Sequence, residues 1–168
     1  NLPAPQNEEI REEPISPYSI GKVASTQMFQ MLHRTENFPA VILRLFLVYG
    51  PGQSDNRFLP QIIKGCLSGK PFPASAGEQL RDFCYVDDVS NAILLALVNK
   101  NVNGEVINIA SGQPIMIREV IKIVQHIINF GTPIFGEIKY TNLFKGFKPL
   151  TLFLSLPTTL LLKINHSF

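Results

Sequence analysis

The chain has 168 residues, of which 45% are hydrophobic and 17% are charged, a balance typical of a globular domain rather than a disordered segment. The formal net charge is only +2 and Lys and Arg form no basic run, so nucleic-acid binding is not expected. The two cysteines and three histidines lack the spacing of a metal site, and no secretory leader is recognisable. These features predict a cytoplasmic protein without a metal.

The first elements are a loop, a helix and a strand. Residues 1–14 are rich in Pro, Asn and Glu and are expected to form the loop. Ser16 and Pro17 predict the start of the helix, because serine can cap free amide groups and proline suits the first turn. Apolar residues at helical spacing extend it to about residue 34. Residues 40–48 form an apolar run rich in branched side chains, typical of a strand buried on both faces in a parallel sheet.

Strands and helices then alternate along the rest of the chain. We expect a helix at 58–67, a Gly/Pro loop at 68–73, a strand at 80–86, a helix at 88–98, a strand at 105–110 and a helix at 117–128. Asp87 and Asp88 are interpreted as capping residues and not as a catalytic carboxylate pair. This alternation predicts an α/β fold with crossover units, although the strands are too few for a complete doubly wound sheet.

The end of the chain has an unusual composition. Residues 140–168 are apolar and rich in threonine, and their pattern fits neither a helix nor a strand. The apolar stretch at 150–162 is shorter than the roughly 20 residues that cross a bilayer, and Pro157 interrupts it. A membrane span is therefore not expected.

Tyr18 and Lys22 are the first candidates for chemistry. They lie four positions apart at the start of the first predicted helix, so their side chains share one face. A lysine ammonium near a phenol stabilises the phenolate, and such a tyrosine can exchange a proton with a substrate hydroxyl. The same spacing also occurs in ordinary surface helices, so the spacing alone leaves a solvated Tyr–Lys pair open.

Three segments in fixed order carry a resemblance to a known family. SPYSIGKVASTQMF, RLFLVYGPG and RDFCYVDDV, within residues 3–125, resemble the extended short-chain dehydrogenase/reductase family of NAD-dependent sugar-nucleotide epimerases, dehydratases and reductases. The resemblance implies a partial Rossmann-type parallel sheet with flanking helices, continuing into a small substrate-binding subdomain. It also implies NAD or NADP as cofactor and a nucleoside-diphosphate sugar as substrate.

The resemblance implies roles for residues on the catalytic side. Tyr18 and Lys22 would perform the acid–base step, and Lys22 would also hydrogen-bond the nicotinamide ribose. Phe46 would lie close to the nicotinamide. Leu47 stands where family members usually carry an asparagine that contacts the substrate, so this contact is altered. Arg44 is interpreted as structurally paired and not as catalytic.

On the substrate side, the resemblance implicates two arginines and a phenylalanine. Arg81 would pair with the substrate diphosphate, and a guanidinium fork suits phosphate oxygens. Arg57, opening a helix, is a second candidate for the same charge. Phe72 lies where family members cradle the nucleotide base. For both arginines an ordinary surface salt bridge is the alternative.

The chain lacks the glycine-rich G-x-x-G-x-x-G turn that a dinucleotide fold places at its first helix. Residues 1–139 are therefore predicted to be the carboxy-terminal part of an epimerase/dehydratase domain, followed by an atypical tail at 140–168. Two functions stay open. The first is an NAD(P)-dependent enzyme present as a fragment, with a homodimer as one option for the full-length protein. The second is a non-catalytic remnant that at most binds sugar nucleotide weakly. A third hypothesis has the tail associate with membranes.

Overall fold

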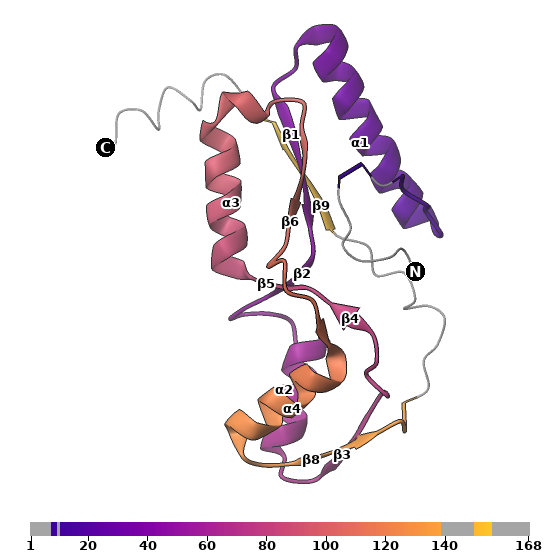
Figure 1. The fold of residues 1–168 in the computed structure, drawn as a ribbon, viewed down its shortest axis with the longest axis vertical. Coiled ribbons are helices and arrows are strands. Elements are labelled where there is room, and N and C mark those ends of the chain that lie inside the picture. Colours follow the sequence, from indigo (N-terminus) through magenta and orange to yellow (C-terminus); the bar gives the residue numbers. More distant parts are fainter. Residues whose placement is uncertain (1–7, 10, 139–149, 156–168) are drawn as a thin grey trace, which may run out of the picture. The chain divides into compact units, whose positions relative to one another are not determined.

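The computed structural model describes residues 8–9, 11–138 and 150–155, and its chain divides into two compact units (Figure 1). Unit 1 contains Asn1–Phe46, Val86–Ile109 and Gly146–Phe168, and unit 2 contains Leu47–Tyr85 and Ala110–Lys145. Each unit is therefore built from segments that are distant in sequence.

Unit 1 is a small sheet with helices on both sides. Its elements are α1 (Pro17–Glu36), β1 (Ala40–Leu45), α3 (Val86–Val98), the 3-10 helix η1 (Lys100–Val102), β6 (Val106–Ile109) and β9 (Leu150–Ser155). The strand order is β6-β1-β9, with β6 parallel and β9 antiparallel to β1. Figure 1 shows α1 and α3 on opposite sides of this sheet, and both helices contact β1.

β1 forms the core of unit 1. Its apolar residues are almost fully buried: Ala40 is 1% exposed, Val41 4%, Ile42 0%, Leu43 0% and Leu45 5%. Successive side chains of a strand point to opposite faces, so burial at consecutive positions means that both faces of β1 are covered. This confirms the prediction of a strand buried on both faces with a parallel neighbour.

Unit 2 combines two helices with three short strand pairs. Its elements are β2 (Leu47–Tyr49), α2 (Phe58–Leu67), β3 (Pro71–Ala74), β4 (Leu80–Arg81), β5 (Phe83–Tyr85), β7 (Ile115–Met116), α4 (Ile117–Ile128) and β8 (Thr132–Phe135). β2 pairs in parallel with β5 and β3 with β8, whereas β4 and β7 are antiparallel. The helices α2 and α4 pack together over a core of Ile62, Cys66, Ala74, Ile117 and Ile121.

The predicted helices at 58–67 and 117–128 have the predicted bounds, whereas the strands differ in detail. The predicted strand at 40–48 is interrupted at Phe46, where the chain leaves unit 1 for unit 2. The predicted Gly/Pro loop at 68–73 contains the first residues of β3. The capping role predicted for Asp87 and Asp88 is wrong, because α3 already begins at Val86 and both carboxylates lie in its first turn. There they interact favourably with the positive end of the helix dipole.

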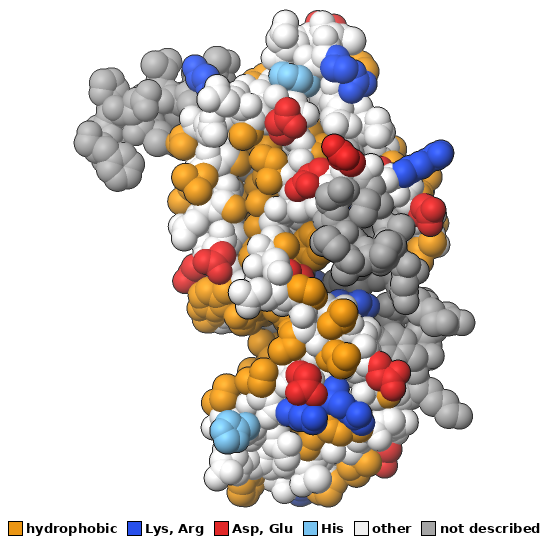
Figure 2. Space-filling model, viewed as in Figure 1, with side chains coloured by type: hydrophobic (Ala, Val, Ile, Leu, Met, Phe, Trp, Pro, Cys, Tyr) orange, Lys and Arg blue, Asp and Glu red, His pale blue; other side chains and the backbone are white. Residues whose placement is uncertain are grey.

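The tail prediction falls largely outside the described residues. Residues 150–155 form β9, for which a strand was not expected, whereas 140–149 and 156–168 are not described. In the described part of the chain, no helix is long and apolar enough to cross a membrane. On the face in Figure 2, the Lys and Arg side chains of the described residues are scattered among acidic and hydrophobic ones.

Candidate active site

Tyr18 and Lys22 lie together at the start of α1. The ammonium nitrogen of Lys22 is 5.6 Å from the centroid of the Tyr18 ring, within the range of a cation–π contact. Tyr18 is 64% exposed, and Lys22 is half-buried. The two side chains therefore share one helix face, and the phenol is accessible from solvent.

The start of α1 is held by a reciprocal pair of serines. The Ser19 amide donates to Ser16 Oγ at 3.1 Å, and the Ser16 amide donates to Ser19 Oγ at 3.0 Å. Ser19 Oγ also accepts from the Ile15 amide at 3.0 Å, and the Ser19 side chain is buried. This capping box fixes the backbone of the turn that carries Tyr18.

Phe46 occupies the break between β1 and β2. Its amide donates to the Ile109 carbonyl at 3.1 Å, and its side chain is half-buried. Phe46 belongs to unit 1, as do Tyr18 and Lys22, whereas Leu47 is the first residue of unit 2. The predicted contact of Phe46 with the nicotinamide stays a prediction.

Arg57 and Arg81 both belong to unit 2. Arg57 is exposed at the N-cap position of α2, and its side chain makes no capping hydrogen bond. Arg81 is half-buried in β4, and its Nη1 donates to the Leu80 carbonyl at 2.8 Å. Their neighbours Phe58 and Phe83 have ring centroids 6.1 Å apart. This ring contact brings the backbone segments that carry the two arginines to one region of unit 2.

Phe72 lies in β3 and packs within unit 2. A Cβ atom at Gly65 of α2 would lie 2.8 Å from the Phe72 ring, so glycine allows the ring to approach the helix closely. Phe72 is half-buried and packs against the core that contains Cys66. Its observed contacts are therefore core contacts, and its predicted role in cradling a base stays a prediction.

Asp82 is a buried carboxylate that the sequence analysis did not single out. It is 9% exposed and accepts from two consecutive amides, Ser111 to Oδ1 at 2.7 Å and Gly112 to Oδ2 at 2.8 Å. The motif around Arg81 contains this aspartate, but its partners lie 29 and 30 positions further along the chain. No local sequence signal connects the two segments.

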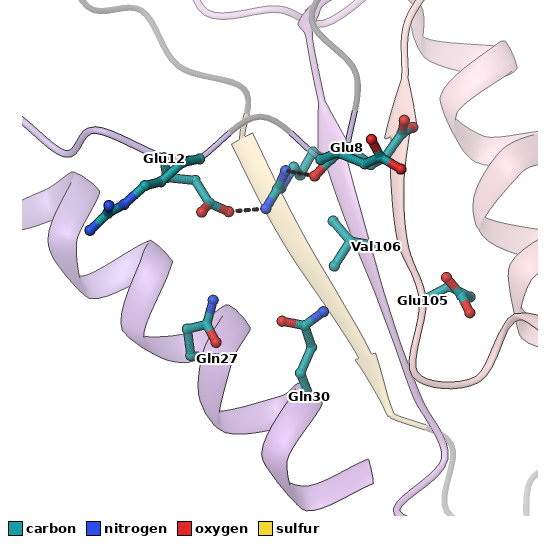
Figure 3. A pocket seen from close by; sticks show the side chains of 9 residues that line it. Glu8, Glu12, Gln27, Gln30, Glu105 and Val106 are labelled. Atoms are coloured by element: carbon teal, nitrogen blue, oxygen red, sulfur yellow. Dashed lines mark hydrogen bonds and ion pairs between the residues drawn. The ribbon is translucent and has the colours of Figure 1, made fainter. Parts of the chain in front are cut away.

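A polar cavity of about 270 Å³ lies in unit 1 (Figure 3). Its lining residues are Glu8, Glu9, Arg11, Glu12, Gln27, Gln30, Arg44, Glu105 and Val106. Arg44 forms an ion pair with Glu12 and donates to the Glu8 carbonyl at 3.4 Å, so the prediction of a structurally paired Arg44 is confirmed. None of the predicted site residues lines this cavity.

An apolar cavity of about 320 Å³ lies in unit 2. It is lined by Tyr49, Gly50, Pro51, Gln53, Leu59, Pro60, Ile63 and Tyr85. The rings of Tyr49 and Tyr85 are tilted with centroids 5.4 Å apart. Among the described residues, no group of three or more His, Cys, Asp and Glu side chains could hold a metal.

The sequence and the fold are similar to those of enzymes that act on nucleotide sugars. A sequence profile of the NAD dependent epimerase/dehydratase family matches residues 1–110. The chain is 30% identical over 138 residues to an uncharacterized UDP-glucose epimerase, YtcB, of Bacillus subtilis (strain 168). The aligned region covers 78% of this chain and 44% of that protein. This chain is also 35% identical over 112 residues to a dTDP-glucose 4,6-dehydratase of Neisseria gonorrhoeae, and that alignment covers 66% of this chain and 32% of the dehydratase.

A solved structure shows the same fold. The UDP-glucuronic acid 4-epimerase from Bacillus cereus, in complex with UDP-glucuronic acid and NAD, superposes with a TM-score of 0.69 at 34% identity. The match covers 78% of this chain and 43% of that one, so the chain spans less than half the length of these three relatives. The profile match and the shared fold show that this chain belongs to the NAD dependent epimerase/dehydratase family.

Proposed function

We propose that this chain carries the proton-transfer and substrate-binding part of an NAD(P)-dependent epimerase, dehydratase or reductase of nucleoside-diphosphate sugars. The main support is the Lys22 ammonium 5.6 Å from the centroid of the exposed Tyr18 ring, in a chain that belongs to this family. We place the epimerase/dehydratase domain at residues 1–139 and regard residues 140–168 as an atypical tail outside the family fold, of which β9 adds a strand to the sheet of unit 1.

In this proposal, Tyr18 exchanges a proton with a sugar hydroxyl. The phenolate form of Tyr18 accepts the proton as the carbon that bears the hydroxyl is oxidised, and the resulting phenol returns the proton in the reverse step. The positive charge of Lys22 stabilises the phenolate, which is the form present before the proton is accepted and after it is returned. The capping box at Ser16 and Ser19 supports this role, because it fixes the helical turn on which the phenol lies.

Arg57 and Arg81 are proposed to bind the substrate diphosphate. Neither guanidinium forms an ion pair with a carboxylate within the described residues, so the structure offers no support for the alternative of surface salt bridges. Arg57 also lies at the amino end of α2, where free backbone amides and the helix dipole favour a negative charge. Phe72 is proposed to contact the base from β3.

The residues present fit only the nicotinamide end of the cofactor. The exposed Tyr18 and the half-buried Lys22 carry hydrogen-bonding groups at the start of α1, where they would hold the nicotinamide ribose, and Phe46 would lie beside the ring. When bound, NAD(P) accepts and returns the hydride of the sugar carbon. The sequence contains no glycine-rich turn for the pyrophosphate. The alternative of a non-catalytic remnant that binds sugar nucleotide weakly therefore stays open.

Calorimetry with the full chain tests the proposal and separates the two alternatives. We expect UDP-glucose or dTDP-glucose to bind saturably, and Arg81→Met to weaken binding by about tenfold because one charge-assisted contact to phosphate is lost. Lys100→Met, in η1 of unit 1, removes the same charge at a residue that is not part of the proposed site and serves as the matched control. Absence of saturable binding to either sugar nucleotide would contradict the proposal.

A parallel titration with NAD and NADP distinguishes the enzyme from the remnant. Binding of a dinucleotide together with turnover of the sugar nucleotide supports the enzyme. Binding of the sugar nucleotide alone supports the remnant.

A further inference from the structure

We propose that Asp82 is a positioning residue for Arg81: its buried carboxylate fixes the turn at Ser111 and Gly112, and this turn holds the strand pair that carries Arg81. The inference rests on the proposed diphosphate-binding role of Arg81, and it adds a residue that does not itself touch the substrate. All the residues involved belong to unit 2.

The carboxylate of Asp82 is held entirely by main-chain donors within the described residues. Each oxygen accepts one amide, from Ser111 at 2.7 Å and from Gly112 at 2.8 Å, and no Lys or Arg of the described part forms an ion pair with it. Its own carbonyl accepts from the Leu47 amide at 3.1 Å. Hydrogen bonds to a charged acceptor are about twice as strong as neutral ones, so the side chain of Asp82 holds the turn at Ser111 and Gly112 firmly, while its carbonyl is bound to the first residue of β2.

The turn that Asp82 binds leads directly into β7. After Gly112, whose φ is +74°, the chain reaches Ile115, which pairs with Arg81, and Met116, which pairs with Leu80. β4 and β7 have two residues each, and a ladder this short is not stable by itself. Its alignment therefore depends on what holds its two ends.

At the end of the ladder opposite Asp82, main-chain hydrogen bonds hold the chain to the start of α4. The Ile117 amide donates to the Gln79 carbonyl at 3.1 Å, and the Arg118 amide donates to the Gly77 carbonyl at 2.9 Å. At the near end, the carboxylate of Asp82 holds the turn. Arg81 lies between these two anchors, so the loss of the carboxylate releases the turn that leads into its partner strand β7 and leaves the anchor at α4 in place.

Asp82→Asn tests this role with the smallest change of shape. The amide keeps one acceptor oxygen but presents an NH₂ group to the second backbone N–H, so one hydrogen bond is replaced by two opposed donors. Glu119→Gln, an exposed site in α4 that pairs with Lys122, removes the same charge and leaves the turn intact. It is the matched control.

Hydrogen exchange of the full chain measures positioning directly and needs no ligand. We expect Asp82→Asn to accelerate exchange by about tenfold at Ser111 and Gly112 and in β4 and β7, with α2 unaffected, because the opening is local. Acceleration at the turn without any effect in β4 and β7 would overturn the inference. Equal acceleration in α2 would do the same, because it would indicate general destabilisation.

A double-mutant cycle with UDP measures the consequence for binding. We expect Asp82→Asn to weaken UDP binding by roughly fivefold in the wild-type background and not at all in the Arg81→Met background, because Asp82 acts through Arg81. Equal weakening in both backgrounds, or none in the wild type, would overturn the inference. If the wild type fails to bind UDP, the proposed function fails, and the exchange pattern alone then decides whether Asp82 positions Arg81.

Discussion

The two units of this chain organise their candidate groups in different ways. In unit 1, Tyr18 and Lys22 come from one helix and meet because they are one turn apart. In unit 2, Arg57 and Arg81 come from separate elements, and Asp82 reaches a turn some thirty residues away. The proposed proton-transfer pair therefore depends on local helix geometry, whereas the proposed diphosphate contacts depend on tertiary packing. Substitutions should affect the two units differently.

The largest expected effect concerns Tyr18 in the proposed proton-transfer pair of unit 1. Tyr18→Phe removes the phenol oxygen, and we expect turnover of UDP-glucose by the full chain with added NAD to fall by about 10²–10⁴-fold, as for loss of a general acid–base. UDP binding, which we assign to unit 2, should stay within twofold of wild type. Product formation followed by NMR, together with calorimetry, measures both.

Tyr49→Phe is the matched control, because Tyr49 lines the apolar cavity of unit 2 and is not part of the proposed site. If the wild-type chain turns over UDP-glucose and Tyr18→Phe retains the full rate, this result would contradict the role of the phenol. Equal losses in the two tyrosine variants would contradict the separation between the units.

Core truncation should separate the units by stability. Leu43 in β1 is 0% exposed and Ile121 in α4 is 1% exposed, so Leu43→Ala and Ile121→Ala should each lower the free energy of unfolding by about 2–5 kcal/mol. We expect hydrogen exchange to accelerate first in the unit that carries the change. Ile127→Ala, at a side chain 74% exposed, is the control. Identical exchange patterns for both core variants would show that the units unfold as one.

How much could be predicted from the sequence follows the same division. The strand at residues 40–45 and the Tyr18–Lys22 face could be predicted, because burial of an apolar run and helical spacing are local properties. β7 and the contact of Asp82 with Ser111 could not, because a two-residue strand exists only where tertiary contacts align it. The family resemblance singled out Arg81 as a candidate, but it did not predict the hydrogen bonds of its neighbour Asp82.

The next effect concerns Gly131, whose backbone lies close to α2 in unit 2. Gly131 has φ of +75°, and a Cβ atom there would lie 2.6 Å from Cys66 Cα in α2. Gly131→Ala should therefore lower the free energy of unfolding by about 1–3 kcal/mol from backbone strain, with a further cost from the clash. Gly136→Ala is the control, because its φ is +90° and nothing lies within 4 Å of the added atom. Equal losses in the two variants would mean that the contact with α2 adds nothing.

A smaller effect is expected at the start of α1. Ser16→Ala removes the oxygen that accepts from the Ser19 amide, and N-cap replacements of this kind cost about 0.5–2 kcal/mol. Since Tyr18 lies in the same turn, UDP-glucose turnover should also fall, by less than for Tyr18→Phe. Ser25→Ala, whose hydroxyl donates to the Gly21 carbonyl within the same helix, is the control. Thermal unfolding and the turnover assay measure the two effects, and unchanged stability of Ser16→Ala would contradict the capping role.

The smallest effect is a pH dependence that originates in the core of unit 2. Burial raises the pKa of the Cys66 thiol, because a thiolate on the buried face of α2, packed against α4, is poorly solvated. The unfolded chain therefore releases this proton at a lower pH than the folded chain, and raising the pH between the two values favours unfolding. Stability from the buried thiol is fully present below the unfolded-state pKa and is lost as pH rises through the higher folded-state pKa. Chemical denaturation of wild type and Cys66→Ala between about pH 7 and 10 should show the wild type losing stability relative to the variant. Parallel pH profiles would mean that the thiol titrates alike in both states, and that the core around Cys66 opens to water more readily than its complete burial indicates.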